Sequence, residues 1–154
     1  MNGHIDIVRK LLESDPNLVK VQDCDGYTPL HRACYENHVD VAKLLLVSGA
    51  NISSQTNELW QPLHSASKWN SSSCVILLLE WGAEINALTR GGLTPLHLAA
   101  SSSNSFETLV VLLNHPLVDT TIKSNNGETA FEISQRCGPF SKLFAIASPS
   151  ISVI

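Results

Sequence analysis

The sequence predicts an all-α solenoid of stacked helix-turn-helix units with projecting β-hairpin loops. A four-residue motif recurs as Thr28–His31, Gln61–His64 and Thr94–His97, and in degenerate form as Thr129–Glu132. The first residues of successive copies lie 33, 33 and 35 positions apart. A unit of this length cannot bury its apolar face alone, so several copies are expected to stack into one continuous core.

Each motif is expected to begin a short first helix. A threonine at the first position, as at Thr28 and Thr94, is a good N-cap, and the proline that follows suits the first helical position. Gln61 replaces this threonine in one copy, at a small expected cost in stability. The helices continue into pairs of small residues that allow neighbouring helices to approach closely: Ala33-Cys34, Ala66-Ser67 and Ala99-Ala100.

A second helix follows in constant phase with the first. Its apolar stripe has the spacing of one helical face, and 16 positions separate its last leucine from the next motif. This helix ends before Gly49 or Gly82, and glycine there supplies a left-handed C-cap. The two extra residues of the longest unit fall in a polar loop, Ser101–Ser105. The stripes are Val8/Leu11/Leu12, Val41/Leu44/Leu45, Cys74/Leu77/Leu78 and Leu109/Leu112/Leu113.

Turn-forming residues precede each first helix and predict the hairpins. They are Asp25-Gly26, Arg90-Gly91-Gly92 and Asn126-Gly127.

These patterns divide the chain into one domain of successive units. The expected divisions are a partial N-terminal repeat at 1–24, repeats at 25–57, 58–90 and 91–125, a degenerate capping repeat at 126–147 and a loose tail at 148–154. Met1 lies just before a second helix, so we expect the natural protein to extend further at its N-terminus. The last unit is expected to hold helices at Ala130–Gln135 and Phe140–Ala147.

The composition narrows the classes of function. The formal net charge is −4 and no Lys/Arg run exceeds Arg9-Lys10, whereas a dedicated nucleic-acid binder needs a basic stripe. No apolar stretch approaches the ~20 residues that span a bilayer, and no secretory signal is recognisable at the N-terminus. The four cysteines are scattered, which indicates reduced thiols in a cytoplasmic or nuclear protein. Cys24 is the thiol expected to be most exposed, whereas Cys34 and Cys74 fall at packing positions.

The repeat resembles the ankyrin repeat. Thr-Pro-Leu-His-x-Ala, the Leu-Leu second helix and the Gly-Ala at its end carry the resemblance over essentially the whole chain. Three stretches, Leu63–Asn70, Leu93–Ala100 and Glu128–Ile133, resemble one particular group within this family. Membership of that group implies a regulatory role, nuclear and linked to transcription or germ-cell development.

The resemblance also gives the recurring histidines a structural role. His31, His64 and His97 are implied to hydrogen-bond within and between repeats. A metal ladder is the alternative, but stacked repeats lie about 10 Å apart while a shared zinc ion needs bonds of about 2 Å. The residues that nucleophilic or acid–base catalysis needs do not converge in any pattern, so neither enzymatic activity nor a cofactor is expected.

Six side chains are candidates for binding a partner. In ankyrin proteins the corresponding positions line the concave groove, and Tyr, Trp and Arg dominate binding hot spots. For Trp69 the alternative is packing beneath the loop between two helices, and Trp81 is expected to cover the end of a second helix. The candidates are Tyr27, Tyr35, Trp60, Lys68, Trp69 and Arg90.

The predicted function is therefore a non-enzymatic protein–protein interaction module, an intracellular adaptor that acts as a monomer. An enzyme with a site in the groove and a nucleic-acid binder are the alternatives. Neither direct nucleic-acid binding nor membrane association is expected. The last three residues, Ser152-Val153-Ile154, resemble a ligand for PDZ domains, which bind such tails by adding a strand.

Overall fold

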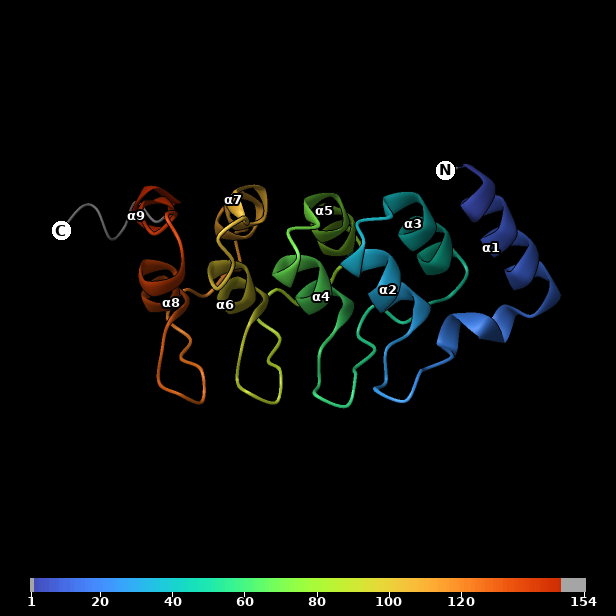
Figure 1. Ribbon diagram of the computed structural model, residues 1–154, viewed down its shortest axis with the longest axis horizontal. Coiled ribbons are helices and arrows are strands. Elements are labelled where there is room, and N and C mark those ends of the chain that lie inside the picture. The colour runs from blue at the N-terminus through green and yellow to red at the C-terminus, as the bar shows by residue number, and fades with distance from the viewer. Residues whose placement is uncertain (1, 148–154) are drawn as a thin grey trace.

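The computed structural model describes residues 2–147, with side chains from Ile5 to Ile146. Helices account for most of this part of the chain (Figure 1). They are α1 (Asn2–Ser14), the 3₁₀ helix η1 (Pro16–Lys20), α2 (Pro29–Tyr35), α3 (Val39–Val47), α4 (Pro62–Lys68), α5 (Ser72–Glu80), α6 (Pro95–Ala100), α7 (Phe106–Leu113), α8 (Ala130–Cys137) and α9 (Lys142–Ala147).

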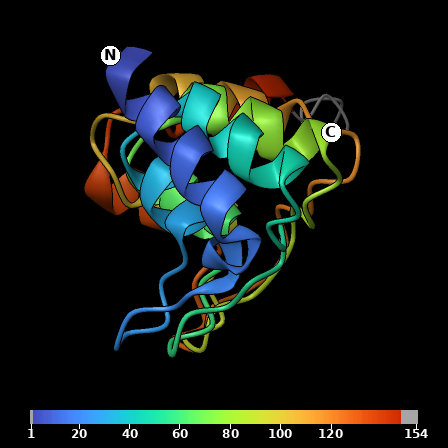
Figure 2. The ribbon, with the colours of Figure 1, turned by 90° about the vertical axis from the view of Figure 1, so that its right-hand side faces the viewer.

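The helices form two parallel rows. The short first helices α2, α4, α6 and α8 make an inner row, and α3, α5, α7 and α9 make an outer row beside it, with α1 at the N-terminal end (Figure 1). Each helix packs on its counterparts in the neighbouring pairs. Viewed along the stack, the connecting loops hang together on one side (Figure 2). The predicted solenoid is confirmed.

The inner helices begin with the predicted caps. Thr28 Oγ1 accepts a hydrogen bond from the backbone N–H of His31 at 3.3 Å, and Thr94 does the same for His97 at 3.2 Å. At Gln61 the backbone N–H of His64 bonds to the Gln61 carbonyl at 2.9 Å instead. The Gln61 side-chain oxygen is buried without a partner among the described residues. One cap is therefore weaker than its counterparts, as the sequence indicates.

The outer helices end as expected. Gly49 and Gly82 have φ values of 101° and 90°, and no neighbouring atom would obstruct a Cβ at either position. The N–H of Ala50 bonds to the carbonyl of Leu45, and the N–H of Gly49 to that of Leu46. These two hydrogen bonds form the Schellman motif. The motif favours glycine, because the left-handed backbone conformation that it requires strains other residues.

The loops project as predicted, but within residues 2–147 none of them contains a β-strand. Each loop is closed by two backbone hydrogen bonds, for example from the N–H of Asp23 to the carbonyl of Tyr27 at 3.0 Å and from the N–H of Gly26 to the carbonyl of Asp23 at 2.9 Å. The corresponding bonds in the later loops join Thr56 to Trp60 and Thr89 to Leu93. Within a loop the backbone bonds end after this one pair, and further hydrogen bonds pass to the neighbouring loops, so no ladder of strand pairs develops in the described part of the chain.

A ladder of side chains links the loop tips. Asn57 Nδ2 donates to the Cys24 carbonyl at 3.0 Å, Arg90 Nη2 donates to the Asn57 carbonyl at 2.9 Å, and Asn125 Nδ2 donates to the Arg90 carbonyl at 2.9 Å. Backbone bonds run beside them, such as that from Asn125 N–H to the Gly91 carbonyl at 3.0 Å. Equivalent positions of successive units thus hold one another, which keeps the loops in register.

The core lies between the two rows of helices. Leu30, Leu63 and Leu96 of the inner row are at most 1% exposed. The outer row contributes Leu78 and Leu112, which are fully buried. The helices pack both within each pair and between neighbouring pairs, as expected for a solenoid.

The C-terminal unit differs slightly from prediction. α8 continues to Cys137 rather than stopping at Gln135, and α9 begins at Lys142 rather than Phe140. Phe140 instead packs edge-on against Phe106 of α7, with ring centroids 5.7 Å apart. The expected loose tail and its PDZ-like end lie outside the described residues. Between Asn2 and Ala147, no helix is long and apolar enough to cross a membrane.

Candidate partner-binding surface

The structure brings two of the predicted binding residues together. Tyr35 ends α2 and Trp69 caps α4, so the two aromatic rings come from neighbouring units. Their centroids are 4.9 Å apart with the planes inclined by 53°. Tyr35 is 40% exposed and Trp69 is 52% exposed, so about half of the Trp69 surface is open to solvent rather than covered by the loop. We refer to Tyr35 and Trp69 as the aromatic pair.

Two asparagines hold the loops that carry the aromatic pair. Asn37 and Asn70 adopt positive φ values of 57° and 53°, which asparagine tolerates better than most residues. The Asn37 side-chain oxygen accepts from the N–H of Cys74 at 3.2 Å. That of Asn70 accepts from the N–H and the hydroxyl of Thr108, at 3.3 and 2.8 Å. Each loop is thereby fixed to the outer helix of the next unit.

The role of Asn37 and Asn70 in fixing these loops was not predicted from the sequence, although their spacing indicates it. Asn37 and Asn70 are 33 residues apart, the same period as the main motif. Ser71 adds a further tie, since its hydroxyl donates to the Tyr35 carbonyl at 3.2 Å. Side-chain hydrogen bonds from Asn37, Asn70 and Ser71 therefore hold the backbone that carries the aromatic pair.

Tyr27 lies at the N-terminal loop and contacts other residues than the aromatic pair. Its ring meets the His31 ring edge-on at 5.6 Å, and the Arg32 guanidinium lies 4.9 Å from its centroid. Arg32 also pairs with Asp23 at 3.0 Å. A backbone hydrogen bond from Tyr27 and, to a lesser extent, the bond from Arg32 lower the pKa of the Asp23 carboxyl below its usual range. Tyr27 is half-buried and belongs largely to the scaffold of this loop.

The remaining candidates are likewise engaged with neighbouring side chains and loops. The Trp60 ring lies 6.3 Å from that of His64. Lys68 Nζ donates to the Ser101 hydroxyl at 3.1 Å. The Arg90 guanidinium, besides its place in the tip ladder, lies 3.8 Å from the Glu58 carboxylate. Of the six predicted residues, Tyr35 and Trp69 are the two whose rings pack against each other.

The three buried histidines bridge neighbouring units. His31 Nδ1 accepts from the backbone N–H of Thr28, so Nε2 carries the ring proton and donates it to the Trp60 carbonyl at 2.8 Å. His64 and His97 reach the carbonyls of Ala87 and Glu128 in the same way. The implied role within and between repeats is confirmed.

Burial shifts these histidines toward the neutral form. It lowers the pKa of His64 to about 4, and it also lowers the pKa of His31 and of His97. A neutral ring is what the arrangement needs, because one nitrogen must accept while the other donates.

The cysteines lie where the sequence places them. Cys24 is exposed, whereas Cys34 and Cys74 are buried. A hydrogen bond with Cys74, together with burial, raises the pKa of the Cys34 thiol, which keeps it protonated. Across the described part of the chain, no three side chains of histidine, cysteine, aspartate or glutamate gather as a metal site would require.

Comparison with known proteins identifies the repeat. A family model described as "Ankyrin repeats (3 copies)" matches residues 1–89, which is more than half of the chain, and one described as "Ankyrin repeats (many copies)" matches residues 78–134. These matches accord with the stacked helix pairs and the bridging histidines.

The chain is also similar to individual relatives. Ankyrin repeat domain-containing protein 49 of Homo sapiens is 54% identical over 139 residues, covering 90% of this chain and 58% of the relative. The Bos taurus protein of the same name is 53% identical over the same extent. That of Drosophila melanogaster is 55% identical over 49 residues, covering 32% of this chain and 23% of the relative. The chain thus spans less than two thirds of these relatives, and it belongs to the ankyrin-repeat family.

Proposed function

We propose that this chain is an adaptor that binds a partner protein through a surface centred on the aromatic pair. Ankyrin repeats are protein–protein interaction modules in general, and the pair is the observation that supports this particular surface. Tyr35 and Trp69 expose large rings side by side instead of burying them. Tyrosine and tryptophan are enriched among the residues that contribute most to binding energy.

The surroundings of the pair support a preformed site. Asn37, Asn70 and Ser71 hold both loops, so little backbone freedom would be lost when a partner binds. The rings have few rotatable bonds and already touch each other, which limits the loss of side-chain entropy. A flat or extended apolar segment of the partner would fit against them.

Where this adaptor acts is a further part of the proposal. The resemblance described above favours regulatory complexes in the nucleus or cytoplasm. Fractionation of cells that express the chain would find it with nuclear or cytoplasmic partners, and recovery with neither would contradict this part alone.

The surface can be tested by capturing partners with variants of equal stability. We expect Tyr35→Ala/Trp69→Ala to weaken capture of specific partners by tenfold or more, because hot-spot truncations cost about 2 kcal/mol or more. Trp81→Ala is a matched control, since Trp81 is 45% exposed but caps the outer helix α5.

Thermal melts of each variant show whether the fold is retained. If the double variant captures the same partners as the wild type while Trp81→Ala loses them, the binding surface lies on the outer row and the proposal is wrong.

A further inference from the structure

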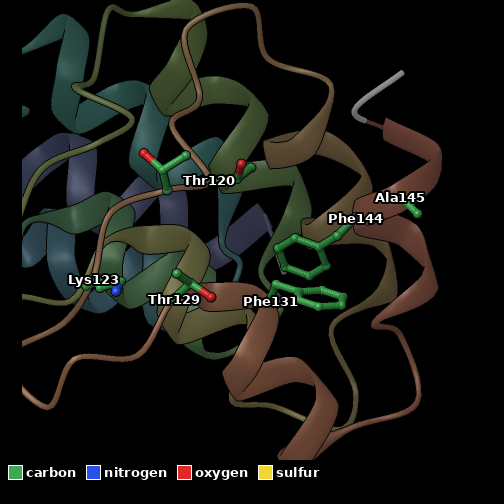
Figure 3. A pocket seen from close by; sticks show the side chains of 7 residues that line it. Thr120, Lys123, Thr129, Phe131, Phe144 and Ala145 are labelled. Atoms are coloured by element: carbon green, nitrogen blue, oxygen red, sulfur yellow. The ribbon is translucent and has the colours of Figure 1, made fainter. Parts of the chain in front are cut away.

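A hollow of about 400 Å³ lies at the C-terminal end of the stack, away from the aromatic pair. It is formed by α8, α9 and the loop before α8 (Figure 3). The rings of Phe131 and Phe144 lie together on one side of it, 5.7 Å apart and inclined by 64°. The other labelled lining residues are Thr120, Lys123, Thr129 and Ala145.

The repeat explains why this face is open and apolar. Phe131 occupies the motif position of Leu30, Leu63 and Leu96, which the following unit buries to 1% exposure or less. Phe131 itself is 38% exposed, because no further unit covers it within the described residues. Phe144 lies deeper and is only 4% exposed. The hollow therefore offers apolar surface of the kind that elsewhere in the molecule forms the core.

The polar groups of the lining are mostly engaged. The Thr129 hydroxyl donates to the Glu132 carboxylate at 3.1 Å, and the hydroxyl of Thr121, which also lines the hollow, donates to Asp119 at 2.6 Å. Among the described residues that line the hollow, Lys123 is the one charged side chain. The Glu132 carboxylate accepts two hydrogen bonds from Thr129, and these, together with the nearby charge of Lys123, lower its pKa, so it stays ionised beside the ammonium.

Size and chemistry together indicate the class of ligand. Small-molecule pockets occupy about 300 to 1,000 Å³ and combine apolar walls with a few polar groups that fix orientation. Here the walls are phenylalanine, alanine and threonine, and the orienting group is the Lys123 ammonium. We propose that the hollow binds a small amphiphile with an apolar chain and one carboxylate, the chain against Phe131 and Phe144 and the carboxylate at Lys123.

Titration calorimetry with two chain-matched probes tests the proposal. Decanoate is expected to bind, and decanol, which lacks the charge, to bind at least about fivefold more weakly. Lys123→Glu should weaken decanoate binding at least about tenfold and leave decanol unchanged. Lys142→Glu is the control, because it makes the same charge change on an exposed residue of α9 that does not line the hollow.

Several results would overturn the proposal. These are no binding of decanoate, equal binding of both probes, or equal loss of decanoate binding in the Lys123 and Lys142 variants. Binding that appears only after removal of residues 148–154 would also overturn it, since the occupant would then be the chain's own end. Phe131→Ala, checked by thermal melting for an intact fold, should weaken both probes.

Discussion

Each buried histidine of the inner helices serves two units at once. His64 accepts the N–H of Gln61 at 2.9 Å through Nδ1 and donates through Nε2 to the Ala87 carbonyl at 2.9 Å. A protonated ring would have to donate from both nitrogens, and it would lose the first of these bonds. The burial that lowers its pKa therefore also ties the stability of the stack to pH.

Acid should destabilise the protein before its carboxyl groups titrate. The pKa of His64 is about 4 in the folded state, against about 6.5 when unfolded. Above pH 6.5 the ring is neutral in both states, and as the pH falls from 6.5 toward 4 the unfolded state takes up the proton first. This residue alone should then remove about 3 kcal/mol of unfolding free energy.

Urea unfolding between pH 7.5 and pH 5 should show about 2 kcal/mol of this loss, because the rest follows between pH 5 and pH 4. His31 and His97 shift in the same direction and should add to it. His64→Gln should reduce the pH dependence while lowering stability at pH 7.5. An unfolding free energy that stays constant down to pH 5 would show that the histidines are not buried as described.

A single asparagine can be tested for its two functions. Asn70→Gly keeps the left-handed backbone but removes the two bonds with Thr108, whereas Asn70→Ala also strains the backbone. We expect the alanine variant to lose about 2 to 3 kcal/mol in chemical unfolding, and the glycine variant about 1 kcal/mol less than that. If both variants lose the same unfolding free energy, the hydrogen bonds of Asn70 stabilise the protein and its left-handed backbone does not.

At the scale of elements, the inner helices differ in how they start. Thr28 and Thr94 cap their helices, but Gln61 leaves a buried side-chain oxygen without a partner among the described residues. The sequence predicted a small cost from the lost cap. It could not show the orphaned oxygen, because burial of that side chain depends on the neighbouring units.

Gln61→Thr should therefore stabilise the protein. We expect a gain of about 1 kcal/mol in urea unfolding, from one new cap and one fewer buried orphan. The reverse change, Thr94→Gln, is the matched comparison and should cost a similar amount. A loss of stability in Gln61→Thr would indicate that packing by the longer glutamine side chain outweighs its unpaired oxygen.

The elements themselves were largely predictable from the sequence. Motif phase and cap residues located the paired helices from Val8 to Leu113, because these signals are local and repeated. The contact between Tyr35 and Trp69 was not predictable, since ring directions depend on side-chain packing between two units. Nor was the engagement of Arg90 in the tip ladder, which depends on how closely neighbouring loops approach.

Over the whole molecule, contacts join each helix pair mainly to its neighbours. Stability in such a stack is approximately a sum over units and interfaces, so the ends should open before the middle. Every residue of α6 is buried, whereas α1 exposes Ile7 and Leu11 by 57% and 51%.

Hydrogen exchange followed by mass spectrometry should resolve this gradient. Amides in α4 and α6 are expected to exchange most slowly, and those in α1 and α9 at least about tenfold faster, because local opening needs less free energy there. Uniform protection from α1 to α9 would instead indicate that the whole chain unfolds as one cooperative unit.

Glutamate stands in the fourth motif where the three earlier copies have histidine, and this difference bears on whether a further unit could stack on α8. Glu132 bonds back to Thr129 and so completes the cap that His97 completes in the preceding unit, but the forward donor is absent. Phe131 and Glu132 are two motif positions at which α8 differs from the inner helices that carry a following unit. Placing leucine and histidine at these positions, and attaching one more helix pair, should supply the buried contact and the bridging bond that a further unit needs, so these two positions define where a new unit could be joined.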